Sequence, residues 1–158
     1  MIGILHIGSF ALYGFGSTLL GISLIKEVRP LSALASAVVA IGLIVHAIAL
    51  ADYVTRWDQL PFAGLGPSLS TLAFLTALGC LLATTLGHAT TVGIVLVPLV
   101  AVLTGVAAIV GVAPAGDPLD WFVIHVIFAF VGLAGLTVAF AAGLMYLLQF
   151  RQLKGKHF

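Results

Sequence analysis

The feature that most constrains the fold of this chain is a long uncharged stretch near its C-terminus. From Trp121 to Phe150 the sequence contains no Asp, Glu, Lys or Arg. A helix of about 20 apolar residues is long enough to cross the hydrocarbon core of a bilayer. The stretch therefore predicts a membrane-spanning helix with residues to spare.

The composition extends this conclusion to the whole chain. Its 158 residues are 62% hydrophobic and 7% charged, with a mean hydropathy of +1.29. Soluble domains carry about 25% charged residues, so a water-soluble fold of this sequence would have almost no polar surface. The net charge of +1, without a basic patch outside the C-terminal tail, indicates no nucleic-acid partner. An integral membrane protein surrounded by lipid is expected.

Charged and turn-forming residues divide the sequence into five apolar runs. Backbone polar groups in a bilayer need helices or closed barrels, and the runs lack the alternation of barrel strands. They therefore predict an all-α bundle forming one transmembrane domain over residues 1–158. The segment 52–58 and Gly87-His88 are predicted to be connections between spans. The predicted spans are approximately residues 2–25, 31–51, 68–86, 91–112 and 121–150.

Lysine and arginine are unevenly distributed between the two sides that five spans define. One side holds Lys26, Arg29, Arg151, Lys154 and Lys156, whereas the other holds only Arg56. Cytoplasmic loops carry the excess of these residues, and tryptophan is enriched at membrane boundaries. The predicted orientation has the N-terminus outside and the C-terminus in the cytoplasm, in the inner (cytoplasmic) membrane. Trp57 and Trp121 then fall at the outer boundary.

Two histidines are predicted to share one depth in the outer leaflet. His46 precedes Asp52 by six residues on an outward-going span, and His125 follows Asp120 by five on an inward-going span. At 1.5 Å per residue both lie roughly 8–9 Å inside the outer boundary. His6, near the outer start of the first span, could join them.

Helical spacing predicts that both histidines point along packing faces and not at lipid. Small residues recur at intervals of three and four on each face, which lets helices or a flat ligand approach closely. The stripe of the second span is Ala35, Val39, Gly42, His46 and Ala49. The stripe of the fifth span is His125, Phe128, Gly132, Gly135, Ala139 and Ala142.

Intramembrane ionisable residues commonly mark functional sites. Neutral imidazole is a good iron ligand, and an apolar slot between helices suits haem. Zinc is less favoured, since no carboxylate or thiolate lies at that depth. Each histidine has an alternative role as an interhelical hydrogen-bonding residue, and this alternative is strongest for His6. The only cysteine, Cys80, excludes an internal disulfide and is predicted to be a buried apolar residue.

Several segments resemble a known family. They are V-H-A-I-A-L at His46, G-P-S-L-S-T-L-A-F after it, V-L-V-P-L-V-A at Pro98, I-H-V-I-F-A-F-V-G at His125, and L-L-Q-F-R-Q-L-K. In this order they resemble the cytochrome c assembly superfamily, specifically its HemX/YpjD-like branch. The resemblance implies a polytopic haem-handling protein in which His46 and His125 match the proposed axial ligands. The tryptophan-rich segment of the synthase members is absent, and family members usually continue into further spans.

These features lead to two expectations for the function. The first is a non-enzymatic membrane protein of cytochrome c assembly or haem handling, holding non-covalent b-type haem between His46 and His125. The alternative is a structural subunit of a larger respiratory or photosynthetic membrane complex, because the short loops leave little besides helix faces for contact. Both expect other membrane proteins as partners.

Overall fold

The computed structural model describes residues 1–26, 29–85, 92–116 and 120–155, and within them the regular structure is entirely helical. The helices are α1 (Ile2–Lys26), α2 (Arg29–Trp57), α3 (Leu65–Thr85), α4 (Gly93–Val110) and α5 (Asp120–Gly155). All five are long and apolar enough to cross a membrane. The prediction of an all-α, multi-pass membrane protein with five spans is confirmed at this level.

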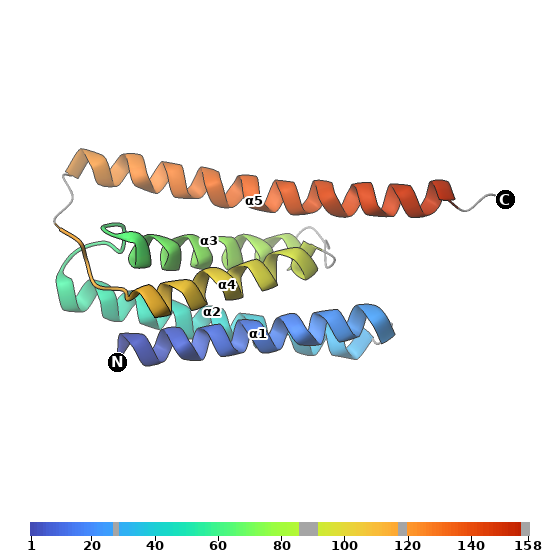
Figure 1. The fold of residues 1–158 in the computed structure, drawn as a ribbon, viewed down its shortest axis with the longest axis horizontal. Helices are drawn as coiled ribbons and strands as arrows, with labels where there is room; N and C mark the ends of the chain where they lie inside the picture. The colour runs from blue at the N-terminus through green and yellow to red at the C-terminus, as the bar shows by residue number, and fades with distance from the viewer. Residues whose placement is uncertain (27–28, 86–91, 117–119, 156–158) are drawn as a thin grey trace.

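Four of the helices form a bundle, and the fifth lies along its side (Figure 1). α1 packs closely on α2 and on α4, and α4 packs in turn on α3. α5 packs mainly on α3 and more sparsely on α4. α1 begins, α2 ends and α5 begins at one end of the molecule (Figure 1). The buried core therefore lies among α1 to α4, with α5 at its edge.

The polar segment after the second apolar run is helical, so the prediction of a connector at residues 52–58 is wrong for most of its length. α2 continues to Trp57. Asp52 and Arg56 are one turn apart, and Arg56 Nε donates to the Asp52 carboxylate at 3.2 Å, a pairing that stabilises a helix. Asp58, the first residue after the helix, has a left-handed φ of 49°, a conformation more accessible to Asp than to most side chains.

α3 begins at Leu65, three residues earlier than predicted. Pro67 fits in its first turn, where a backbone N–H has no intrahelical acceptor. Gly66 packs directly against the Gly111 carbonyl, so a side chain here would collide with the backbone. α4 is shorter than predicted and contains Pro98, as expected. The predicted turn at Gly87-His88 lies outside the described residues.

Close approach of α1 and α2 depends on two glycines. A Cβ at Gly16 would lie 2.7 Å from Val39 Cγ2, and one at Gly42 would lie 3.1 Å from the ring of Tyr13. Small residues allow such close contact between membrane helices. The residues predicted for the packing face of the second span, including Gly42 and His46, are all buried, which confirms that prediction.

α5 is much less buried than the other helices. Its 36 residues extend about 54 Å, compared with about 30 Å of hydrocarbon in a bilayer, and it runs past the ends of the neighbouring helices (Figure 1). Its buried face includes Ala134 and Ala141, and Val138 lies next to Gly79 of α3. The predicted packing stripe of the fifth span, from His125 to Ala142, is instead exposed, so that prediction is wrong within this chain.

Candidate functional site: a buried histidine–serine cluster

Four polar side chains from three helices meet in the core. His6 and Tyr13 come from α1, His46 from α2 and Ser70 from α3. All four are buried, with no more than 1% of any of them exposed. We refer to these four residues as the histidine–serine cluster.

Ser70 lies between the two imidazoles. Its Oγ is 2.7 Å from His6 Nε2 and 2.9 Å from His46 Nε2. The other ring nitrogens are also occupied, since His6 Nδ1 is 3.0 Å from the Ile2 carbonyl oxygen and His46 Nδ1 is 3.4 Å from the Tyr13 hydroxyl. Every imidazole nitrogen in the cluster therefore has a hydrogen-bond partner.

With both rings neutral, only one arrangement of protons satisfies these contacts. The Ile2 carbonyl only accepts, so His6 Nδ1–H donates to it and His6 Nε2 accepts from the Ser70 hydroxyl. Ser70 Oγ then accepts from His46 Nε2–H, and His46 Nδ1 accepts from the Tyr13 hydroxyl. Neutral rings suit this place, because a buried charge needs an opposite charge and no carboxylate takes part in these bonds. The chain of bonds thus has a single direction, from Tyr13 to Ile2.

Ring packing supports the hydrogen bonds. The His6 and His46 ring centroids are 5.4 Å apart at an interplanar angle of 72°. Phe74, one turn after Ser70 on α3, meets the His46 ring edge to face, at 5.8 Å and 80°. Such T-shaped contacts are favourable arrangements for aromatic pairs, and here they restrict rotation of the His46 ring.

Local sequence positions each member. His6 and Tyr13 are seven residues apart, so they lie on one face of α1 two turns apart. Gly42, one turn before His46, allows α2 to lie against Tyr13. Ser70 and Tyr13 had not been predicted as site residues. The seven-residue spacing between His6 and Tyr13 was the only signal in the sequence, and it concerns Tyr13 alone. Spacing within one helix does not reveal that Ser70, on another helix, faces these residues.

The structure brings together His6 and His46 but not His46 and His125. His125 is exposed on α5, a helix that packs mainly on α3 and only sparsely on α4. His6, predicted as a candidate third residue, is instead the direct neighbour of His46. His88 and His157 lie outside the described residues.

The residues only partly fit an iron-bound haem. Neutral imidazoles in an apolar bundle have the right chemistry, and His125 is open. His46, however, has no free nitrogen while it is bonded to Ser70 and Tyr13. Among the residues that the structure describes, no group of three or more His, Cys, Asp or Glu is placed to hold a metal ion. His46 is buried on α2 and His125 is exposed on α5, and α5 packs mainly on α3.

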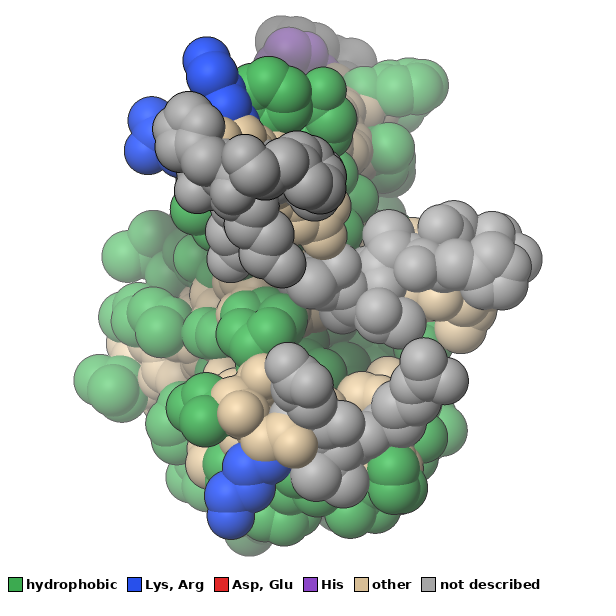
Figure 2. Space-filling model, turned by 90° about the vertical axis from the view of Figure 1, so that its right-hand side faces the viewer, with side chains coloured by type: hydrophobic (Ala, Val, Ile, Leu, Met, Phe, Trp, Pro, Cys, Tyr) green, Lys and Arg blue, Asp and Glu red, His purple; other side chains and the backbone are tan. Residues whose placement is uncertain are grey.

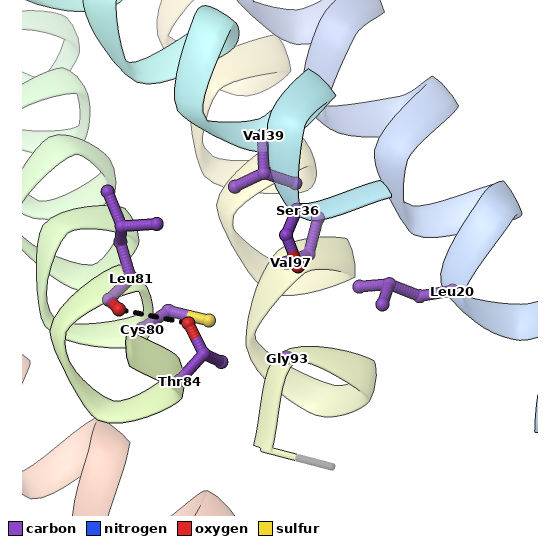
Figure 3. A pocket seen from close by; sticks show the side chains of 8 residues that line it. All are labelled: Leu20, Ser36, Val39, Cys80, Leu81, Thr84, Gly93 and Val97. Atoms are coloured by element: carbon purple, nitrogen blue, oxygen red, sulfur yellow. Dashed lines mark hydrogen bonds between the residues drawn. The ribbon is translucent and has the colours of Figure 1, made fainter. Parts of the chain in front are cut away.

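A separate small pocket lies nearer the other end of the bundle, among α1 to α4 (Figure 3). The thiol of Cys80 borders it, and Cys80 is a free, buried residue as predicted. The hydroxyls of Ser36 and Thr84 at its edge donate to carbonyls of their own helices, at 3.0 Å and 2.9 Å. The pocket therefore offers a mainly apolar lining and no convergent set of polar groups.

The five apolar helices define the class of this protein as a multi-pass helical membrane protein. Its distinguishing internal feature is the histidine–serine cluster. No protein-family model, curated protein or solved structure matches the chain.

Proposed function

We propose that this chain is a haem-handling membrane protein of the cytochrome c assembly type, with His46 and His125 as its iron ligands. The observation that carries the proposal is that three of the apolar helices each contain a histidine in the half nearest the same end of the molecule. This is the end where α1 begins, α2 ends and α5 begins (Figure 1), and the residues are His6, His46 and His125. Ionisable residues are costly within a membrane, so such a concentration favours a functional role. The sequence segments around His46 and His125 resemble those of the superfamily.

The two proposed ligands differ in availability. His125 is exposed on an apolar helix, which makes it the open imidazole. His46 is closed by Ser70 and Tyr13, so its use as a ligand requires those bonds to break. Because α5 packs sparsely against the bundle, a rearrangement that brings the two histidines together would break few contacts between helices.

Charge distribution supports the proposed orientation, with the N-terminus outside and the C-terminus in the cytoplasm. Lys26, Arg151 and Lys154 lie at the inner ends of α1 and α5, and Figure 2 shows basic side chains at this end of the molecule. At the opposite end Arg56 is paired with Asp52. This asymmetry follows the rule that cytoplasmic loops of membrane proteins carry the excess of Lys and Arg, and we propose the inner (cytoplasmic) membrane as the location.

Titration of the detergent-purified chain with hemin tests the proposal. The expected result is a low-spin spectrum with one haem per chain, because two imidazoles give the iron six-coordinate ligation. His46→Ala and His125→Ala should each lose the low-spin spectrum. Thr137→Ala is the matched control, since its hydroxyl only donates to the Leu133 carbonyl of its own helix. An unchanged low-spin spectrum in both histidine variants would rule out the pair.

A second function, as a structural subunit of a larger membrane complex, is favoured by the exposure of α5. In the most apolar segment of α5 only 11% of the residues are buried, compared with 22–44% in the corresponding segments of the other four helices. A helix that packs so little within its own chain has faces available for another membrane protein. His125, as a polar residue on that helix, provides a group for such a partner to contact.

Purification in a mild detergent distinguishes this second function. A photo-reactive amino acid at Phe128, which is 74% exposed, should cross-link to a protein that copurifies at fixed stoichiometry. A chain that purifies alone and cross-links only to lipid would exclude the subunit role.

A further inference from the structure

We propose that Ser70 is a positioning residue that holds His46 in a closed state, so that a ligand must displace the Ser70 hydroxyl to reach His46 Nε2. This inference rests on the haem-handling function proposed above and adds to it a means of control. The geometry that carries it is the convergence of two Nε2 atoms, from His6 and His46, on the one oxygen of Ser70.

The first step concerns the capacity of the serine hydroxyl. A hydroxyl has one proton to donate and two lone pairs. Since the Ile2 carbonyl fixes His6 Nε2 as an acceptor, the Ser70 proton is committed to His6. The bond between Ser70 and His46 therefore depends on His46 Nε2 carrying a proton. In that form His46 Nε2 has no lone pair for a metal.

The second step concerns the other nitrogen of His46. With its proton on Nε2, His46 accepts at Nδ1 from the Tyr13 hydroxyl. The proton must move to Nδ1 before Nε2 can become a ligand, because neutral imidazole carries only one N–H. Tyr13 must then accept instead of donating. Opening of His46 thus requires a tautomer change as well as separation from Ser70.

The third step is that His6 reinforces this closed state without being a ligand. Its Nδ1–H is oriented by a backbone carbonyl one turn earlier on α1, and its ring contacts the His46 ring. His6 holds the proton of Ser70 away from His46 and leaves the serine oxygen as an acceptor. All the imidazole nitrogens of the histidine–serine cluster therefore have hydrogen-bond partners within the protein. Opening the cluster exchanges these hydrogen bonds for contacts with a ligand.

Nitrogen-15 NMR of the histidine side chains tests the closed state without haem. The variant His88→Gln/His125→Gln/His157→Gln retains only His6 and His46. The expected spectrum shows opposite neutral tautomers, with the proton on Nδ1 of His6 and on Nε2 of His46. Adding Ser70→Ala should convert His46 into a mixture of tautomers. Adding Ser68→Ala should not, because the Ser68 hydroxyl donates to the Phe62 carbonyl.

Hemin binding to chains that keep all five histidines tests whether Ser70 limits access of a ligand to His46. Ser70→Ala is expected to bind hemin about tenfold more tightly than the natural chain, which is the effect of releasing one hydrogen bond of ordinary strength. Ser68→Ala should bind as the natural chain does. The double variant Ser70→Ala/His46→Ala should lose the gain.

The outcomes separate this inference from the function on which it rests. Hemin binding by the natural chain with no gain in Ser70→Ala would overturn the role of Ser70. The same tautomer at both histidines would overturn the closed state itself. Failure of every variant to bind hemin, with opposite tautomers intact, would instead overturn the haem-handling function and, with it, the control exerted by Ser70.

Discussion

At the scale of single residues, the core of this protein is organised by one serine between two histidines. Membrane interiors offer no water to satisfy a polar group, so a buried imidazole nitrogen without a partner costs free energy. In the histidine–serine cluster each nitrogen is satisfied, and Ser70 Oγ serves two of them. The cluster thereby stabilises the meeting of α1, α2 and α3, whatever further role it has.

Loss of the Ser70 hydroxyl should therefore destabilise the fold. Ser70→Ala leaves two imidazole nitrogens unpaired, and we expect a loss of about 1–3 kcal/mol in the free energy of unfolding. Tyr13→Phe removes only the 3.4 Å bond to His46 and should cost less, about 0.5–1 kcal/mol. Unfolding in mixed detergent micelles measures both variants. Equal stability of Ser70→Ala and Ser68→Ala would contradict the account.

Sequence reasoning recovered only part of this cluster. His46 was predicted to lie on a packing face because small residues surround it at helical spacing, and it is buried. His6 was predicted as a candidate companion of His46. Ser70 and Tyr13 were missed, because which side chain of one helix meets which of another depends on the rotation and axial position of both helices. Periodicity within one helix does not determine either quantity.

At the scale of helices, the contact between α1 and α2 depends on the absence of side chains at specific positions. Gly16 and Gly42 face Val39 and Tyr13 across the interface. Val is β-branched and stiff at χ1, so Val39 has little freedom to move aside. This close packing holds Tyr13 near His46.

Gly16→Ala tests this contact. The added Cβ would lie 2.7 Å from Val39 Cγ2, and such overpacking typically costs about 1–3 kcal/mol. Gly14→Ala is the matched control on the same helix, because a Cβ there meets nothing within 4 Å. Thermal unfolding in detergent should show a lower midpoint for Gly16→Ala and no loss for Gly14→Ala. Similar midpoints would show that the interface is looser than described.

The stripes of small residues in α2 and α5 look alike in the sequence but have different environments. In α2 the stripe faces the bundle, whereas in α5 it is exposed. The difference arises because α2 is packed closely against α1, while α5 has mainly α3 beside it. Helical periodicity identifies a face, but the number of neighbouring helices decides whether the chain itself covers that face.

At the scale of the whole molecule, five apolar helices and the charges at their ends define how the chain would sit in a membrane. The number and type of spans were predictable because long uncharged runs have few alternatives in a bilayer. The end of the second span was misplaced, since the Asp52–Arg56 pair allows polar residues to continue a helix. The orientation is a prediction from the basic residues.

Cysteine labelling tests the orientation. Cys80 is buried, so the natural chain should react weakly with a membrane-impermeant thiol reagent. Applied to intact cells, the reagent should label Arg56→Cys and not Lys154→Cys, because the two positions are predicted to lie on opposite sides. In cells opened by lysis both should be labelled. Labelling of Lys154→Cys in intact cells would reverse the proposed topology.

The most direct measurement for the proposed function is the absorption spectrum of the purified chain, oxidised and reduced, with haem quantified by the pyridine haemochrome method. The account predicts a low-spin haem spectrum after loading with hemin, near one haem per chain, that is lost in His125→Ala. Absence of haem from the natural chain and from Ser70→Ala, each loaded with hemin, would contradict it.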